Sequence, residues 1–568
     1  MSVNPPSRGT TSVSTTMALP QEVWWIVSQQ FKDRRDFGSL YKCALVNRSF
    51  ANITLPLLYS IHDLSPASTG DTAVVETEKW ACLWRSIVMS SVGKTVYPYC
   101  LWIKALNLGN FYSLLEDLAR DRVRVGRIVL NYKQIRDWFF SYPLGAFLHA
   151  NKSKKPVLDI EKIVLDVGNK VTSFIKQAAE DEDKTVMLSS LEGYHLPSPY
   201  LSSLVSRLSL LSSLRVRDGS VLTAEVSQAI RNNCPFFKEV VCHYCVGTDV
   251  DEELAGFIRG LPPNSLESFT IMSTNAVHNQ TFQALSGHSV SLRSLVISLD
   301  QPGLAALHLL SECKNLESVT IEASRLAQIL DWERELKQEF QEVVSWLSGC
   351  LSLTNLELLL VPSATSILDP IFKVPQIRLT SLDVKLLDAN DEFFASLGQQ
   401  TDLESLVVQT VEGLLDIGTE RHQQFTNSIC NCTKLRKLDL MSELLTMEDI
   451  VRIAQSLPQL EDFSFDGEIG NDSLLPIAGM HRLKTLNVNA VSHFTFEGIL
   501  RFIADLQLDP RASHDGLRIY IMRQFGEHKI SNEEERILAD EVARSFEGRF
   551  EITYEADPDE LHESDFSD

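Results

Sequence analysis

The chain of 568 residues carries a formal net charge of −23 at pH 7. This acidity argues against a nucleic-acid or anionic-membrane partner, because both attract proteins through basic patches. No apolar run reaches the roughly 20 residues that cross a bilayer, and the N-terminus has no apolar signal core. We therefore expect a cytosolic or nuclear protein whose residues 1–16 are a disordered tail and whose ten scattered cysteines are free thiols.

Three short helices are predicted between Leu19 and Tyr59. Pro20 suits the first position of the first helix, where its missing N–H costs no hydrogen bond. Phe37-Gly38-Ser39 is expected to break the chain, and Asn47 is expected to cap the third helix. A segment of roughly 40 residues has too little interior to be stable alone, so it needs further surface to pack against.

Two adjacent tryptophans, Trp24 and Trp25, lie on the first of these helices. They cannot share one helix face, because consecutive residues point about 100° apart. We therefore expect burial on two sides, against the rest of the chain and against a partner.

The same stretch resembles the F-box, the module that docks a substrate receptor onto the Skp adaptor of an SCF-type cullin–RING ubiquitin ligase. The resemblance rests on Leu19-Pro20, Glu22-Val23, Ile26, Leu45-Val46, Arg48, Phe50 and Pro56-Leu57-Leu58-Tyr59. It implies an F-box over residues 17–62, with adaptor contacts through Leu19, Pro20, Val23, Ile26, Val27, Leu45, Val46 and Phe50. The alternative is a helical cap that only seals the end of a repeat array.

A linker and junction follow over residues 63–98. Apolar residues from Trp80 to Val88 recur at i, i+3, i+4, i+7 and i+8, which predicts a helix that packs the first domain onto the next. Gly93-Lys94-Thr95 lacks the earlier glycine and the preceding strand of a phosphate loop, so we reject that motif.

From about residue 100 a short phrase recurs: apolar, two variable residues, apolar, one variable residue, apolar. Clear copies begin at Leu266, Leu292, Leu316, Leu379, Leu403, Leu435, Leu460 and Leu483, and looser copies at Ile103, Ile160, Leu211, Phe237 and Leu353. Consecutive clear copies usually lie about 23 to 32 residues apart, the spacing of leucine-rich repeats. The predicted fold is an α/β leucine-rich-repeat solenoid over residues 99–554, with a strand and a helix per repeat and parallel strands on the concave face.

The repeats are irregular. The Asn or Cys that often follows the phrase in regular leucine-rich repeats is mostly missing, so we expect uneven curvature. Asp331–Gly349 is predicted to be one long helix, and the poorly matching region Leu108–Tyr200 leaves room for a hidden enzyme. The solenoid is expected to end in a helix between two strands, followed by an acidic disordered tail over residues 555–568.

The variable strand residues face the concave side, where leucine-rich repeats usually bind partners. We expect Asp383, Lys437, Asp439, Asp462 and Asp466 to bind substrate, through a basic or polar segment of that substrate. The alternative is a strand face that only contacts solvent.

No motif supplies a catalytic nucleophile, a glycine-rich cradle or a His-rich metal cluster. Cys242-His243-Tyr244-Cys245, with Cys234 upstream, could suggest zinc, but a structural zinc site needs four ligands, typically as two pairs. Cys242 is the last apolar residue of its phrase, and Cys often packs as a small hydrophobe. We therefore expect no metal, no cofactor and no catalytic residue.

The F-box and the repeats together resemble fungal F-box proteins with leucine-rich repeats. The resemblance implies a non-catalytic substrate receptor, in which the F-box binds the Skp adaptor and through it a cullin. The repeats would bind an unidentified protein substrate, and other subunits would transfer ubiquitin. The alternative is a scaffold that binds the adaptor without ligase function.

Overall fold

The computed structural model describes residues 20–61, 73–120, 123–125, 128–130, 132–147, 158–181, 184–193, 196–273, 276–325, 331–387, 391–410, 419–489, 491–508, 514–524 and 529–554. The chain divides into two compact units. The first holds residues 1–215 and 232–236, and the second holds residues 216–231 and 237–568.

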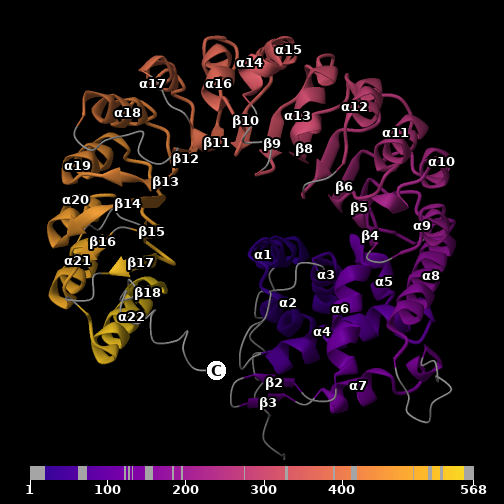
Figure 1. Cartoon of the computed structure of the whole chain (residues 1–568). Coiled ribbons are helices and arrows are strands. Elements are labelled where there is room, and N and C mark those ends of the chain that lie inside the picture. The colour runs from indigo at the N-terminus through magenta and orange to yellow at the C-terminus, as the bar shows by residue number, and fades with distance from the viewer. Residues whose placement is uncertain are drawn as a thin grey trace, which may run out of the picture. The chain divides into compact units, whose positions relative to one another are not determined.

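Helices dominate the first unit (Figure 1). Its elements are α1 (Gln21–Asp33), α2 (Phe37–Ala44), α3 (Arg48–Tyr59), α4 (Ala73–Ser91), α5 (Tyr99–Trp102), β1 (Ala105–Asn107), α6 (Leu108–Ala119), β2 (Val123–Val125), β3 (Ile128–Leu130), α7 (Lys133–Phe139), α8 (Ile160–Ala179), β4 (Ser190–Gly193), α9 (Ser198–Val205) and the start of β5 (Ser213–Asp218). β1 pairs in parallel with β4, and β2 pairs antiparallel with β3.

Side-chain caps begin the second and third helices. Asn47 Oδ1 accepts the Phe50 N–H at 3.0 Å, which confirms the predicted cap of α3. Asp36 Oδ1 accepts the Ser39 N–H at 2.9 Å and begins α2. The predicted break at Phe37-Gly38-Ser39 is therefore wrong, because these residues form the first turn of α2 and the chain breaks just before them.

Helix α4 is the predicted junction helix, and it anchors α3. The buried Trp84 ring packs on Phe111 with centroids 4.6 Å apart. At the end of α3, Tyr59 stacks on Tyr99 with centroids 4.6 Å apart, and its hydroxyl lies 2.5 Å from Ser86 Oγ of α4. Burial raises the pKa of Tyr59, so the phenol stays protonated and neutral.

The looser repeat copy at Ile160 is wrong, because this stretch begins α8 rather than a strand. Asp159 Oδ1 accepts the Lys162 N–H at 3.2 Å and caps the helix. Apolar residues then recur at helical spacing over many turns and are buried: Ile163, Val164, Val167, Val171, Ile175 and Ala178. A six-residue phrase cannot tell a strand from the start of a long amphipathic helix.

Strands and helices alternate through the second unit, with 3-10 turns between some of them. Its elements are α10 (Ala224–Asn233), β6 (Glu239–Tyr244), α11 (Val250–Gly260), β7 (Ser268–Ile271), α12 (Asn279–Leu285), β8 (Ser294–Leu299), α13 (Gln301–Ala306), β9 (Ser318–Ala323), α14 (Trp332–Glu335), α15 (Lys337–Ser348), β10 (Asn355–Leu359), α16 (Ala364–Phe372), β11 (Ser381–Leu387), α17 (Asp391–Leu397), β12 (Ser405–Thr410), α18 (Glu420–Cys430), β13 (Lys437–Leu445), α19 (Met447–Ser456), β14 (Asp462–Gly470), α20 (Leu474–Ala478), β15 (Thr485–Val488), β16 (Val491–His493), α21 (Phe496–Leu508), β17 (Arg518–Gln524), α22 (Asn532–Phe546) and β18 (Arg549–Tyr554).

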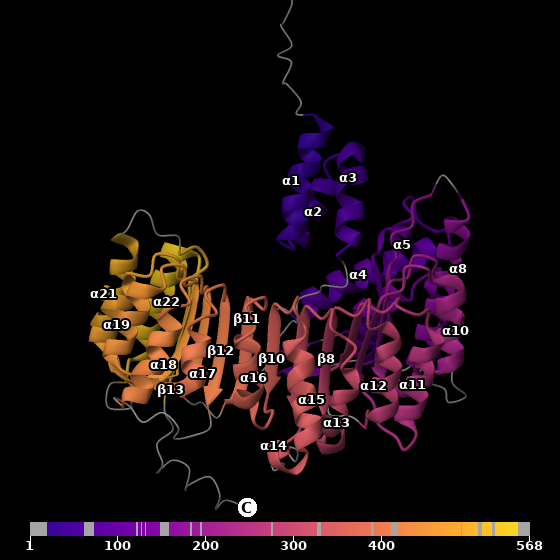
Figure 2. The ribbon, with the colours of Figure 1, turned by 90° about the horizontal axis from the view of Figure 1, so that it is seen from above.

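The second unit is a leucine-rich-repeat solenoid, as predicted. Strands β6 to β15 pair in parallel in chain order, followed by β17 and β18. In Figure 1 these strands follow the inner side of an arc and the helices its outer side, and Figure 2 shows the strands side by side. Each phrase other than the one at Ile160 has a strand that begins two residues after its first apolar residue.

The prediction of one helix over Asp331–Gly349 is wrong. Leu336 leaves the helical region, with φ −126° and ψ 50°, and separates α14 from α15. The rings of Trp332 and Phe340 lie 5.4 Å apart, edge to face. In one straight helix these two residues would be separated by about 12 Å of rise, so the break is what lets both reach the core.

Buried thiols form a ladder between repeats. Each lies within reach of a main-chain carbonyl of the preceding repeat: Cys313 of Leu285 at 3.9 Å, Cys350 of Cys313 at 3.6 Å and Cys432 of Leu397 at 3.8 Å. Cys350 and Cys432 also have a slightly closer acceptor in their own helix, Trp346 O at 3.4 Å and Ser428 O at 3.7 Å. Burial raises the pKa of each thiol to about 12, so all three keep their protons. The three cysteines precede the phrases at Leu316, Leu353 and Leu435, whereas the Asn or Cys of regular leucine-rich repeats follows the phrase.

Candidate protein-interaction surfaces

Apolar side chains lie exposed on α1, on α2 and in the turn before α3. They are Val23, Trp25, Ile26, Tyr41, Leu45 and Val46, and each is between 36% and 68% exposed. We call this set the helical apolar surface. Leaving apolar area in water costs about 25 cal/mol per Å² relative to burying it, and apolar patches of soluble proteins commonly mark interaction sites.

Four of the predicted adaptor contacts belong to the helical apolar surface, namely Val23, Ile26, Leu45 and Val46. Pro20 is the exposed N-cap of α1 rather than its first residue, and Val27 is half-buried. Phe50 is half-buried, and Leu19 lies outside the described residues.

The two tryptophans point to different surroundings, as expected. Trp24 is half-buried and packs edge to face on Phe50, with ring centroids 4.8 Å apart, so it ties α1 to α3. Trp25 is 52% exposed. Neither Trp25 nor Tyr41 was among the predicted adaptor contacts. A large aromatic residue on an otherwise polar helix face is the sequence signal that could have indicated them.

Charged side chains gather on the open face of strands β10 to β13 in the second unit. Register places Glu357 beside Asp383, Asp383 beside Val407, and Val407 beside Asp439. On β9, Thr320 donates its hydroxyl to Glu357 Oε2 at 3.1 Å. Neighbouring strands lie about 4.8 Å apart, so Asp383 and Asp439 face each other across Val407 at about twice that spacing.

Two lysines accompany these carboxylates. Lys385 follows Asp383 on the same face of β11, and Lys437 precedes Asp439 on the same face of β13. We call Glu357, Asp383, Lys385, Lys437 and Asp439 the concave charge cluster. Three of its members were predicted to bind substrate, and Lys385 was predicted only to face the concave side. Glu357 was not predicted, and it belongs to the looser repeat copy at Leu353.

Asp383 is the least satisfied member of the concave charge cluster. Its Oδ1 has no accessible surface and no hydrogen-bond partner in the described structure. Burial raises the pKa of Asp383, and Glu357 and Asp439 raise it further, while Lys385 and Lys437 act in the opposite direction. Desolvation without a hydrogen bond is costly for a carboxylate, but Oδ1 is closed to solvent, so an added donor would have to reach the other carboxylate oxygen of Asp383.

The other predicted carboxylates have nearer partners or less exposure. Asp439 Oδ1 accepts the Met441 N–H at 3.2 Å. Asp466 is 9% exposed and accepts the Gly467 N–H at 2.7 Å. Asp462 is paired in register with Lys437 on the neighbouring strand. The predicted substrate residues therefore lie along β11, β13 and β14, and Asp383 is the one among them with a buried oxygen that lacks a hydrogen-bond partner in the described structure.

Charges at the edge of the same sheet, just before the strands, are paired. Lys238 lies 2.8 Å from Glu267, Arg293 lies 3.5 Å from Glu317, and Glu461 bridges Arg436 at 2.7 Å and Lys484 at 2.6 Å. Exposed pairs of this kind contribute about 0 to 1 kcal/mol each. Opposite charges from neighbouring repeats are thus in contact at this edge. Within the concave charge cluster, the described structure shows no such ion pair.

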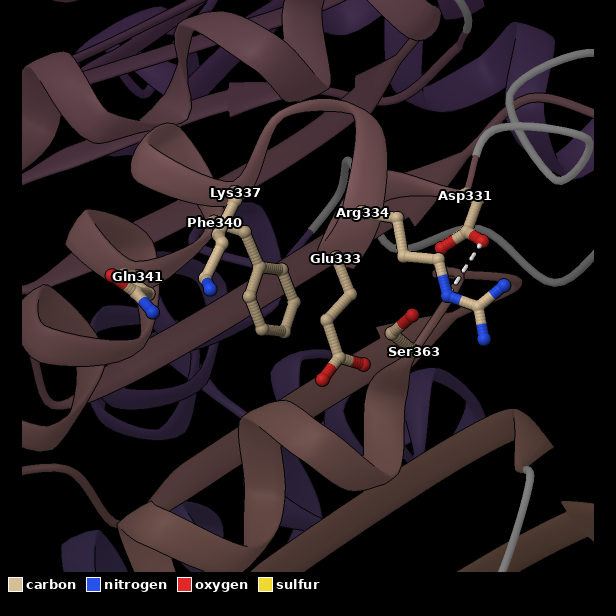
Figure 3. A pocket seen from close by; sticks show the side chains of 7 residues that line it. All are labelled: Asp331, Glu333, Arg334, Lys337, Phe340, Gln341 and Ser363. Carbon is tan, nitrogen blue, oxygen red and sulfur yellow. Dashed lines mark ion pairs between the residues drawn. The ribbon is translucent and has the colours of Figure 1, made fainter.

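A polar cavity of about 670 Å³ lies beside α14 and α15. Figure 3 shows its lining side chains: Asp331, Glu333, Arg334, Lys337, Phe340, Gln341 and Ser363. Arg334 Nε lies 3.5 Å from Asp331 Oδ2, and Glu333 Oε2 accepts the Ser366 hydroxyl at 3.0 Å. Two acidic and two basic groups balance here, so the cavity favours neither an anionic nor a cationic ligand.

Cys242 and Cys245 form a buried pair with their Sγ atoms 3.4 Å apart. The hydrogen bond with Cys245 and burial both raise the pKa of Cys242, so this thiol stays protonated. Within the described ranges, no group of three or more His, Cys, Asp or Glu side chains could hold a metal ion. Nor does the described part of the chain contain a helix that is long and apolar enough to span a bilayer.

No protein-family model and no curated protein matches this sequence. Many solved structures are similar to it, among them the following three, all at low identity. The plant peptide hormone receptor RGFR1 in complex with RGF2 is 12% identical, with a TM-score of 0.28, over 59% of this chain and 53% of that one. The TLR13–ssRNA13 complex is 13% identical, with a TM-score of 0.30, over 67% and 52%.

The third structure is the leucine-rich repeat-containing protein LegL7 from Legionella pneumophila. It is 11% identical, with a TM-score of 0.26, over 56% of this chain and 90% of that one. The chain thus spans about half the length of the first two structures. At this identity the likeness concerns the repeat fold alone.

Proposed function

We propose that this chain is a non-catalytic substrate receptor of an SCF-type cullin–RING ubiquitin ligase, acting in the cytoplasm or nucleus. Helices α1 to α3 would dock the Skp adaptor, and the concave face of the repeats would bind the protein substrate. The observation that carries the proposal is the helical apolar surface. Six apolar side chains exposed on and between three short helices are the pattern expected of half an interface.

The packing around α3 supports this proposal. Trp24 and Phe50 join α1 to α3, while Tyr59 fastens α3 to α4 and α5. The three helices are thus held firmly from within the first unit, and their apolar side chains remain free for a partner. A preformed surface loses less conformational entropy when it binds.

The mechanism would be proximity. A receptor that holds a substrate near a charged conjugating enzyme raises the effective concentration of substrate lysines at the reactive thioester. No side chain of this chain would take part in covalent chemistry. The repeat fold, a protein-interaction architecture, is consistent with that role.

The test is direct binding of the purified full chain to a Skp adaptor, measured by titration calorimetry. We expect binding in the wild type and its loss in the double variant Ile26→Asp, Leu45→Asp. Val290→Asp is the matched control, because Val290 is 61% exposed but lies in the second unit. Unchanged binding in the double variant would contradict the proposal, provided that circular dichroism shows both variants folded.

A second candidate is a scaffold that binds the adaptor without a cullin. Adaptor binding alone does not separate the two functions, because both use the same helices. Reconstitution with the adaptor and a cullin does so. A stable complex of all three proteins supports the receptor, and displacement of the cullin by this chain supports the scaffold.

A further inference from the structure

Opposite charges are in contact at the edge of the sheet, and on its open face Arg549 contacts Glu551 on β18, but no ion pair involves Asp383 in the described structure. At the edge, Glu461 bridges Arg436 and Lys484 at 2.7 and 2.6 Å. On the open face, Asp383 has neither an ion pair nor a hydrogen bond in the described structure, although lysines lie on its own strand and two strands away. The strand spacing is similar in both places, so geometry alone does not prevent pairing.

Lys385 and Lys437 act on Asp383 through space without an ion-pair contact, and Glu357 and Asp439 act against them. Glu357 and Asp383 are side by side, and like charges in register on neighbouring strands repel each other. Asp439 lies on the far side of Val407, which offers an apolar platform between two carboxylates. A cationic side chain placed over Val407 would relieve this repulsion and could donate to both Asp383 and Asp439.

We propose that the concave charge cluster binds an arginine or lysine side chain of the protein substrate, laid over Val407 between Asp383 and Asp439. Glu357 supplies a further negative charge beside Asp383. Lys385 and Lys437 flank the position and are available to main-chain carbonyls or acidic side chains of the same segment. The identification of that segment as a ligase substrate rests on the proposed function above, but the contact itself does not.

Other regions of the described structure give weaker grounds for a ligand. The cavity beside α14 and α15 has balanced charges, and three of the four are already engaged: Asp331 with Arg334, and Glu333 with the Ser366 hydroxyl. The thiols of Cys242 and Cys245 are both buried, and the hydrogen bond between them raises the pKa of Cys242. The concave charge cluster combines an unpaired carboxylate with an open sheet face and so specifies the charge of its ligand.

The experiment uses the purified full chain and four synthetic peptide libraries. Each library has random flanks and a fixed central residue: arginine, lysine, norleucine or glutamate. Retention is measured by affinity enrichment and mass spectrometry at low ionic strength, where charge pairs act most strongly. We expect the arginine and lysine libraries to be retained at least about tenfold better than the norleucine library, and the glutamate library least of all.

The variants test which carboxylates are responsible. The double variant Glu357→Gln, Asp383→Asn should abolish the preference for basic peptides, and Asp383→Lys should reverse it toward the glutamate library. Glu239→Gln is the matched control, because Glu239 lies on the same sheet face at β6, far along the sheet from β11. It should leave the preference intact.

Three results would overturn the inference: no preference for basic over norleucine peptides, no retention of the basic libraries, or a preference that survives the double variant. Thermal unfolding of each variant shows whether it is folded, and Asp383→Asn keeps the side-chain volume. Adaptor binding is measured on the same samples. If the chain does not bind the adaptor but retains the preference for basic peptides, the ligase function is contradicted and this contact is not. If the chain binds the adaptor but shows no preference for basic peptides, only this contact is contradicted.

Discussion

His422 Nε2 lies 2.7 Å from Asp449 Oδ2, and the two side chains are only 3% and 4% exposed. This pair joins α18 to α19 inside the solenoid. The same carboxylate accepts the N–H and the hydroxyl of Thr446 at 2.9 and 2.5 Å, which completes a capping box at the start of α19. One side chain thus caps its own helix and fastens it to the preceding repeat.

Asp449 should make the solenoid sensitive to acid. Burial alone raises the pKa of Asp449, but hydrogen bonds from His422 and Thr446 lower it well below the ordinary value of 3.8. A carboxyl with a depressed folded pKa adds stability above its unfolded pKa, and that stability is lost as the pH falls. We expect the free energy of unfolding, measured with urea, to decrease below about pH 4.

Asp449→Asn should lower the free energy of unfolding by about 1.5 to 3 kcal/mol at pH 7, because it removes a buried carboxylate that accepts hydrogen bonds from His422 and Thr446, and should flatten the pH dependence. Glu448→Gln is the control, since the Glu448 side chain is 70% exposed and pairs only with Arg452. We expect it to cost less than about 1 kcal/mol. Equal losses in the two variants would contradict a special role for the buried pair.

The adjacent tryptophans should separate stability from adaptor binding. Trp24→Ala removes the ring that packs on Phe50, so we expect the free energy of unfolding to fall by about 1 to 3 kcal/mol. Trp25→Ala removes an exposed ring and should change stability by less than about 0.5 kcal/mol.

Binding should depend on Trp25 specifically. Trp25→Ala is expected to weaken adaptor binding at least about tenfold, because large aromatic residues often dominate interfaces. Chemical denaturation and titration calorimetry on both variants measure the two quantities. The idea fails if Trp25→Ala binds the adaptor like the wild type while remaining folded.

The thiol ladder should protect its cysteines from reagents. Cys313 and Cys350 are fully buried, and burial raises the pKa of both to about 12, so the reactive thiolate is scarce. In the native protein we expect a thiol-specific dye to label the exposed Cys82 first. Peptide mapping after brief labelling gives the order, and early labelling of Cys313 would contradict the ladder.

Removing a ladder thiol should also cost stability. Cys313→Ala should lower the free energy of unfolding by about 1 to 2 kcal/mol, since the Leu285 carbonyl loses its donor and a small cavity forms. Cys82→Ala should change it by less than about 0.5 kcal/mol. Urea unfolding compares the two variants.

Gly467 should not tolerate a side chain. Its φ is +157°, and an added Cβ would lie 2.6 Å from the Leu445 carbonyl oxygen. Gly467→Ala should therefore destabilise the solenoid by about 1 to 3 kcal/mol. Gly470→Ala is the control, because a Cβ added there would meet nothing within 4 Å and the φ of Gly470 is −133°. Melting temperatures that match in the two variants would refute this expectation.

Local sequence predicted the caps well, because a cap needs only a short polar side chain and a helix that starts beside it. Asn47 caps α3 as predicted. The same local reasoning misplaced the break between α1 and α2, because Asp36 caps α2 one residue before the expected interruption begins. Such boundaries depend on which of several polar residues the packed chain uses.

The interaction surfaces were only partly predictable. Four exposed apolar residues, Val23, Ile26, Leu45 and Val46, followed from the sequence, but Tyr41 did not. On the concave face, the sequence showed which residues alternate outward. It could not show that Asp383 remains unpaired, because that depends on strand register and on side chains from neighbouring repeats.

By itself, the sequence determined the repeat architecture, because leucines at fixed spacing can all be buried only by stacked strands and helices. It could not determine where a helix breaks within a long apolar pattern, or whether a short apolar pattern forms a strand or a helix. Leu336 breaks a helix so that Trp332 and Phe340 can meet, and Ile160 begins a helix where a strand was predicted. Those outcomes were decided by tertiary packing, because burial of large side chains outweighs the small differences in local propensity.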